Sequence, residues 1–153
     1  MLTIIGCGNL NRSDDGVGVL IAQRIQRALQ DTPLLNVRVY DCGTGGMEVM
    51  FQARGSTALI IIDASSTGSE PGAIYQVPGE VLEQLPTQGY SLHDFRWDHA
   101  IAAGRKIFGE DFPSEVTVYL IEAENLGLGL ELSPSVAKAA EQVYAELMLK
   151  LQA

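Results

Sequence analysis

The sequence has little cysteine, no long apolar run and few basic residues, and each shortage excludes a class of protein. Its 2 cysteines, Cys7 and Cys42, are too few for a disulfide framework and indicate a reducing compartment. No apolar run approaches the roughly 20 residues of a membrane span. With 10 lysines and arginines against 19 aspartates and glutamates, the net charge of -9 argues against nucleic acid or an anionic membrane as partner.

The chain also lacks targeting and low-complexity features. Residues 1–5 carry no basic leader and precede no long apolar region with a small-residue cleavage site, so we expect no signal peptide. Together with the low cysteine content, this predicts a cytoplasmic protein. No internal repeat or linker interrupts the sequence, and residues 1–153 are expected to form a single domain.

An uninterrupted apolar run, Ala58-Leu59-Ile60-Ile61-Ile62, lies at the centre of the predicted fold. Such a run without alternation is typical of a strand buried on both faces, as in a parallel sheet. Similar runs predict strands at 2–7, 37–41 and 116–121, and a more amphipathic strand at 72–77 lies at or near an edge. We therefore predict an α/β protein, a three-layer sandwich with a mostly parallel sheet of about five strands flanked by helices.

Four helices are expected between and after these strands. The first is capped by Ser13 and continues to about residue 30, and a short second helix after the glycine-rich turn at 43–46 is expected to face Met47, Met50 and Phe51 inward. A third runs from a capping box at 91–94 to about residue 108. The last begins at Pro134 and presents an apolar face from Val136 to Leu151.

Carboxylates follow several of the predicted strands. Asp14 or Asp15, Asp41 and Asp63 come after three strands whose carboxyl ends meet at one edge of the sheet, where ligands of open α/β sheets bind. His93 is expected at the mouth of the third helix. Two carboxylates and an imidazole can hold a divalent ion such as zinc, nickel, iron or manganese, with coordination positions left for water or substrate.

Each of these residues also has a structural explanation. Asp15 can stabilise a helix start, Asp63 can cap a loop, and His93 can be a surface residue. Asp41 serves either near the site, by supporting a ligand or transferring a proton, or as a cap for the glycine turn that follows. His99 is expected on a helix surface and Trp97 in the core.

Two other kinds of site, a dinucleotide site and a cysteine hydrolase, have weaker support in the sequence. A dinucleotide site would need glycine three positions after Gly8, where Asn11 stands, and Asp14 and Asp15 would repel a pyrophosphate. A cysteine hydrolase would pair Cys7 or Cys42 with His93, but cysteines in buried strands are more often small apolar residues.

Four motifs in register resemble those of the hydrogenase maturation endopeptidases over nearly the whole chain. They are Gly6-x-Gly8-Asn9 with Asp14-Asp15-Gly16-Val17-Gly18; Asp41-x-Gly43-Thr44-Gly45-Gly46-Met47-Glu48; Ile61-Ile62-Asp63-Ala64; and Ser91-x-His93. The resemblance continues through the Leu132-Ser133-Pro134-x-Val136 opening of the last helix. The sequence departs from the family pattern at Ala123, after Glu122, where relatives often have proline.

The resemblance implies a protease that removes the C-terminal extension of a nickel-iron hydrogenase large-subunit precursor after nickel insertion. The nickel, carried by the substrate, would be the recognition mark. By position, Asp15, Asp63 and His93 would be the metal-contacting and catalytic residues, with the choice between Asp14 and Asp15 slightly open. The precursor is expected to contact the acidic edge and the loops 65–71 and 86–90, the latter a candidate lid. The alternative is a non-catalytic chaperone that binds nickel or the precursor.

Overall fold

The computed structural model describes residues 1–79 and 97–152, and in them the chain forms a five-stranded sheet in the order β2-β1-β3-β5-β4. Strands β1, β2, β3 and β5 are parallel, whereas β4 is antiparallel and lies at the edge. The strands are β1 (Leu2–Cys7), β2 (Val37–Gly43), β3 (Ala58–Ser65), β4 (Ile74–Pro78) and β5 (Glu115–Glu122). The predicted mostly parallel sheet with an amphipathic edge strand is confirmed.

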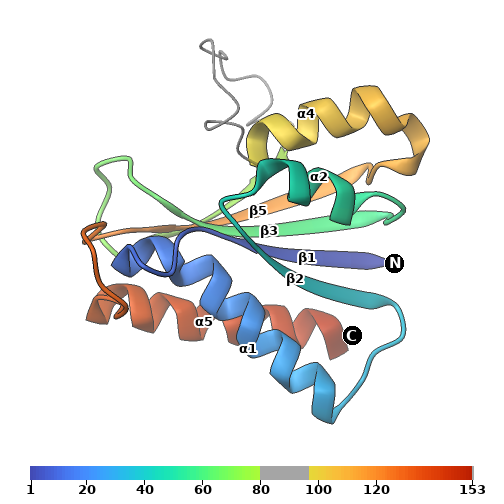
Figure 1. Cartoon of the computed structure of the whole chain (residues 1–153). Coiled ribbons are helices and arrows are strands. Elements are labelled where there is room, and N and C mark those ends of the chain that lie inside the picture. Colours follow the sequence, from blue (N-terminus) through green and yellow to red (C-terminus); the bar gives the residue numbers. More distant parts are fainter. Residues whose placement is uncertain (80–96, 153) are drawn as a thin grey trace.

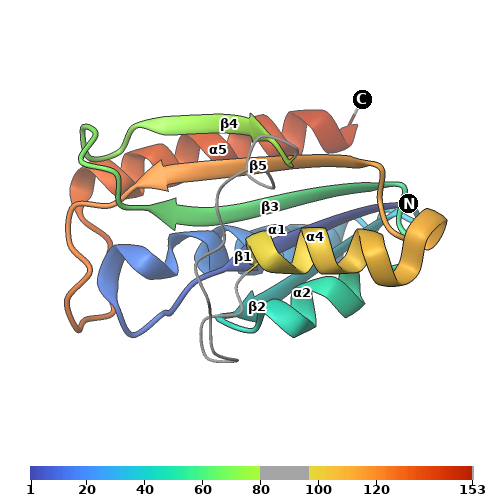
Figure 2. The same cartoon turned by 90° about the horizontal axis from the view of Figure 1, so that it is seen from above.

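Helices cover both faces of the sheet, as Figures 1 and 2 show from two directions. Helices α1 and α5 pack on one face, and α2 and α4 pack on the other. The helices are α1 (Val17–Asp31), α2 (Gly46–Ala53), α4 (Trp97–Phe108) and α5 (Pro134–Gln152). This arrangement is the three-layer sandwich that the sequence predicts. No helix in the described residues is both long and apolar enough to cross a membrane.

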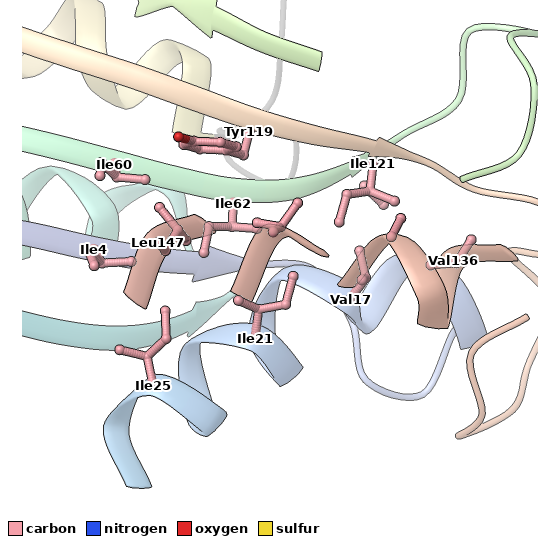
Figure 3. Close-up of a cluster of buried hydrophobic side chains, with 13 residues drawn as sticks. Ile4, Val17, Ile21, Ile25, Ile60, Ile62, Tyr119, Ile121, Val136 and Leu147 are labelled. Carbon is pink, nitrogen blue, oxygen red and sulfur yellow. The ribbon is translucent and has the colours of Figure 1, made fainter. Parts of the chain in front are cut away.

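The apolar side chains divide into two clusters, one on each face of the sheet. Figure 3 shows the cluster between the sheet and the α1–α5 layer, where Ile62 of β3 meets Ile21 of α1 and Leu147 of α5. On the other face, Ile61 of β3 packs with Val49 of α2 and other side chains. Successive residues of β3 thus pack into the apolar clusters on opposite faces of the sheet, which explains why its sequence is apolar without alternation.

Glycines let helix α1 approach the sheet at the point where β1 ends. A Cβ atom added at Gly18 would overlap the backbone carbonyl oxygen of Ile62, and one added at Gly6 would overlap that of Gly18. A side chain at either position would push α1 away from the sheet. The glycines around the β1–α1 connection therefore set the position of the segment that carries Asp14 and Asp15.

Two details differ from the sequence prediction. Ser13 does not cap α1; it has a φ of 51° and begins a 3-10 helix, η1 (Ser13–Gly16), which precedes α1. In α2 the inward residues are Val49, Met50 and Ala53, whereas Met47 and Phe51 are exposed. The prediction for Met47 and Phe51 was wrong. The helix begins at Gly46, and the residues that face the sheet lie about one position earlier in the sequence than predicted.

Candidate active site at the carboxyl edge of the sheet

The Asp15 backbone and the Asp63 carboxylate both lie close to Gly8, just beyond the carboxyl end of β1. A Cβ atom added at Gly8 would overlap the backbone oxygen of Asp15 and lie 3.5 Å from Oδ1 of Asp63. Gly8 has a φ of 129°, a conformation that favours glycine, and its N–H donates to the Gly43 carbonyl of β2 at 2.8 Å. The tight turn thus holds together the ends of β1, β2 and β3 and the start of η1.

The two carboxylates are oriented by backbone N–H groups. Oδ2 of Asp15, which is half-buried, accepts the Asn9 N–H at 2.9 Å. Asp63 is only 2% exposed, and its Oδ1 accepts the N–H of Ala64 at 2.8 Å. Both side chains are therefore held at the edge where ligands of open α/β sheets bind.

Asp14 has a different role from its neighbour. Its fully buried carboxylate accepts the N–H groups of Glu124 and Asn125 at 2.9 and 2.8 Å. It also accepts the N–H and hydroxyl of Ser133, at 2.7 and 2.9 Å, at the start of α5. Burial alone would raise the pKa of Asp14, but these hydrogen bonds stabilise the anion and leave its pKa below the usual 3.8. Asp14 fastens the β5–α5 loop, and its carboxylate is turned away from solvent.

Asp41 lies in a cleft next to the Gly8 turn. The cleft has a volume of about 440 Å³ and is lined by Gly8, Asn9, Leu10, Val19, Asp41, Gly43 and Thr44. Oδ2 of Asp41 accepts a hydrogen bond from Gln23 of α1 at 2.9 Å, whereas the Gly45 N–H of the glycine turn donates to the Cys42 carbonyl. Of the two sequence-based interpretations of Asp41, these contacts favour a place near the site over a cap for the turn.

A cysteine nucleophile is disfavoured by the surroundings of the thiols. Burial, together with the nearby negative charges of Glu48 and Asp41, raises the pKa of Cys42 to about 12. The thiol is therefore protonated at neutral pH and a poor nucleophile. Cys7 is buried among apolar side chains of the α2–α4 face. A dinucleotide is disfavoured too, because the Asp15 backbone oxygen fills the space beside Gly8 and the Asp63 carboxylate next to it would repel a pyrophosphate.

Glu122, at the end of β5, is a buried carboxylate whose role the sequence analysis missed. It accepts hydrogen bonds from the N–H and hydroxyl of Thr67 at 2.9 and 2.8 Å, and from the Ser65 hydroxyl at 3.1 Å. Burial opposes its ionisation, but these bonds and one from the Gly68 backbone leave its pKa below the usual 4.5. Glu122 fixes the loop after Asp63. The available signal was its position at the end of the apolar run of β5, like that of Asp63 in β3.

The third predicted ligand, His93, lies outside the described residues, as do the loop 86–90 and the 91–94 capping box. Within residues 1–79 and 97–152, no group of three histidine, cysteine, aspartate or glutamate side chains is placed to hold a metal ion. The part of the predicted site that the structure describes is therefore the pair Asp15 and Asp63. His99 is half-buried on α4 rather than fully on the helix surface.

Comparison with known proteins points to one family. The family model described as hydrogenase maturation protease matches residues 19–150. The Hydrogenase 2 maturation protease of Escherichia coli (strain K12) is 31% identical over 153 residues, covering 95% of this chain and 90% of that protein.

Solved structures of similar fold agree. The hydrogenase maturating endopeptidase HybD from E. coli has a TM-score of 0.81 at 27% identity, covering 99% of this chain and 91% of that one. The NiFe hydrogenase maturation protease HycI from Thermococcus kodakarensis KOD1 has a TM-score of 0.77, covering 98% of this chain and 90% of its own. At 21% identity the second likeness shows the fold alone.

Proposed function

The chain belongs to the hydrogenase maturation protease family, and we propose that it removes the C-terminal extension from the large-subunit precursor of a nickel-iron hydrogenase. Cleavage follows nickel insertion, and the nickel carried by the precursor is the mark that the enzyme recognises. The reaction takes place in the cytoplasm, a reducing compartment in keeping with Cys7 and Cys42, which form no disulfide.

The observation that carries this proposal is the convergence of Asp15 and Asp63 on the Gly8 turn. Asp15 and Asp63 are 48 positions apart in the sequence, yet the Asp15 backbone and the Asp63 carboxylate both lie close to Gly8 at the ligand-binding edge of the sheet. The Asp15 carboxylate accepts the N–H of the next residue, Asn9. Carboxylate oxygens are suitable ligands for a divalent metal, and His93 supplies an imidazole as the third contact. With three contacts from the protein, positions on the nickel remain for the precursor and for water.

The proposed chemistry is peptide hydrolysis at a bond that the nickel places beside the carboxylates. Water adds to the scissile carbonyl carbon, one of the carboxylates accepts a proton from it, and the leaving nitrogen takes up a proton as the C–N bond breaks. His93 contacts the metal as a neutral imidazole, so metal contact weakens when the histidine is protonated. The open backbone around Gly43 and the cleft beside Asp41 leave room for an extended peptide.

The test is the intact mass of a nickel-loaded precursor incubated with three forms of the protein. The unmodified protein is expected to release a C-terminal fragment. His93→Ala is expected to abolish release without lowering the thermal midpoint, because it removes a metal contact. His99→Ala, which changes the other of the 2 histidines, is the matched control and should cleave.

The alternative, a chaperone without catalysis, gives a different result in the same experiment. A chaperone would bind the precursor in a pull-down and leave its mass unchanged in every tube. Cleavage by His93→Ala at the rate of the unmodified protein would instead reject His93 as a contact of the substrate's nickel.

A further inference from the structure

The loop between β5 and α5, residues 124–132, carries three exposed leucines; we name it the leucine loop. Leu126, Leu128 and Leu130 are 40%, 80% and 74% exposed and alternate with Gly127 and Gly129. Single exposed leucines are ordinary, but three exposed leucines close together on one short loop concentrate apolar surface there. A patch of this kind on an acidic protein marks a surface that another molecule covers.

The leucine loop is held in place, so the leucines cannot turn inward by a collapse of the loop. At its start, the N–H groups of Glu124 and Asn125 donate to Asp14. Further along, the Ser13 hydroxyl donates to the Gly127 carbonyl at 2.8 Å, and the Ser13 N–H donates to the Gly129 carbonyl at 2.8 Å. The φ of 51° at Ser13, unusual for a serine, is maintained by these contacts.

The same hydrogen bonds join the leucine loop to the candidate site. Gly129 pairs with Arg12 in a parallel bridge and donates its N–H to the Asn11 carbonyl at 3.0 Å. Residues 11–13 lead directly into Asp15. Figures 1 and 2 both show the β5–α5 loop beside the β1–α1 connection, at the edge of the sheet where β3 and β5 end.

On the premise that the chain acts on a hydrogenase precursor, we propose that the leucine loop docks apolar side chains of that precursor next to the scissile bond. The occupant is the substrate protein, because the patch adjoins Asp15 through residues 11–13. A second copy seated there would obstruct the candidate site. An anionic membrane would be repelled by the net charge of -9 and by Glu124 and Glu131, which are exposed in the same loop.

The test is a double variant, Leu128→Ser/Leu130→Ser, assayed with the whole nickel-loaded precursor. Leu35→Ser is the matched control, because Leu35 is 94% exposed and precedes β2 at the opposite edge of the sheet. Loss of two central apolar contacts is expected to raise KM and the Kd for the precursor by about 30-fold, with little change in kcat. The control should match the unmodified protein, and both variants should keep its thermal midpoint, since the changed side chains are exposed.

Other outcomes separate this proposal from the proposed function. Cleavage with KM within twofold of the unmodified protein, or an equal rise for Leu35→Ser, would overturn the docking surface and leave the protease intact. Leucine-dependent binding of a precursor that is never cleaved would support the docking surface and reject the protease. Sedimentation showing that the unmodified protein is a dimer and the double variant a monomer would assign the loop to a second copy and overturn the proposal.

Discussion

Asp14 and Asp15 are adjacent in η1, yet their carboxylates meet opposite surroundings. Asp14 is fully buried and accepts hydrogen bonds from Glu124, at the start of the leucine loop, and from Ser133, just after its end. Asp15 is half-buried and accepts the Asn9 N–H of the Gly8 turn. One aspartate thus contributes to stability, and the other is available to a ligand at the edge of the sheet.

Replacement of each aspartate by asparagine should therefore give opposite results. Asp14→Asn removes the charge and turns an N–H donor toward other donors, so we expect it to lower the free energy of unfolding by about 3 kcal/mol. Asp15→Asn should change the free energy of unfolding by less than about 1 kcal/mol and reduce precursor cleavage at least 100-fold. Urea denaturation and the intact-mass assay measure the two effects. Full cleavage by Asp15→Asn, with loss of cleavage by a folded Asp14→Asn, would reverse the assignment.

Spacing in the sequence identified Asp14 or Asp15 together with Asp63, and only the family resemblance favoured Asp15 over Asp14. Position at the end of a buried apolar run, or in the loop after it, predicts which carboxylates reach the edge of the sheet. The partners of Asp14 are more than 100 residues away in the chain, since its hydrogen bond to Glu124 spans 110 positions. A contact between residues so far apart in the chain cannot be predicted from the local sequence around Asp14. Residue 93 lies outside the described residues, so its role as a ligand stays a prediction.

At the scale of elements, the close approach of α1 to the sheet places the candidate site. Gly18 leaves no room for a side chain, because the backbone oxygens of Ile62 and Cys7 lie against it. Both are backbone atoms of strands, which cannot give way as a flexible side chain could. The position of η1 relative to β3, and with it that of Asp15 relative to Asp63, depends on this contact.

Gly18→Ala should therefore destabilise the fold and disturb the site together. We expect a loss of about 3 kcal/mol in the free energy of unfolding, at the upper end of overpacking costs, because the added methyl group overlaps backbone. Gly45→Ala is the matched control: an added Cβ there lies 3.4 Å from its nearest neighbours, an ordinary contact. Thermal and urea denaturation compare the two variants. Equal midpoints would show that α1 can move away from the sheet at no cost.

Helices and strands were predictable from the sequence where an apolar pattern extends over many residues, whereas the residues at which they begin and end were harder to predict. The apolar runs located the strands, and the stripe of Val17, Ile21 and Ile25 identified α1, because burial imposes these periods. The start of α1 was misplaced because Ser13 serves the leucine loop with its hydroxyl instead of capping the helix. In α2, only 8 residues long, the period is too short to fix which side chains face inward.

Across the whole molecule, two buried carboxylates fasten the loops at the carboxyl edge to the sheet. Asp14 holds the leucine loop and the start of α5, and Glu122 holds the loop after Asp63 through Thr67 and Ser65. Both carboxylates are ionised in the folded protein, with pKa values below their usual 3.8 and 4.5. The stability of the domain is therefore linked to pH through the same edge that carries the candidate site.

This linkage predicts that the protein loses stability as the pH falls below about 4.5, the usual pKa of a glutamate such as Glu122. Because the pKa values of Asp14 and Glu122 are lower in the folded state, the unfolded chain binds more protons in this range. The free energy of unfolding then rises with pH. The contribution of the two carboxylates is complete above the pKa values that they have in the unfolded chain, and it is lost as the pH falls through the lower pKa values that they have in the folded protein. Urea midpoints measured from pH 3 to pH 6 should show this slope.

Glu122→Gln should be less stable than the unmodified protein near pH 6 and should lose less stability on acidification, because one of the two linked groups no longer titrates. Glu146→Gln, at an exposed position on α5, is the matched control and should keep the original slope. If the slope of Glu122→Gln equalled that of the unmodified protein, Glu122 would not contribute to acid sensitivity. If Glu122→Gln showed a smaller dependence of stability on pH and still cleaved the precursor at neutral pH, the Glu122 carboxylate would contribute to stability by holding the loop and would not be needed for cleavage.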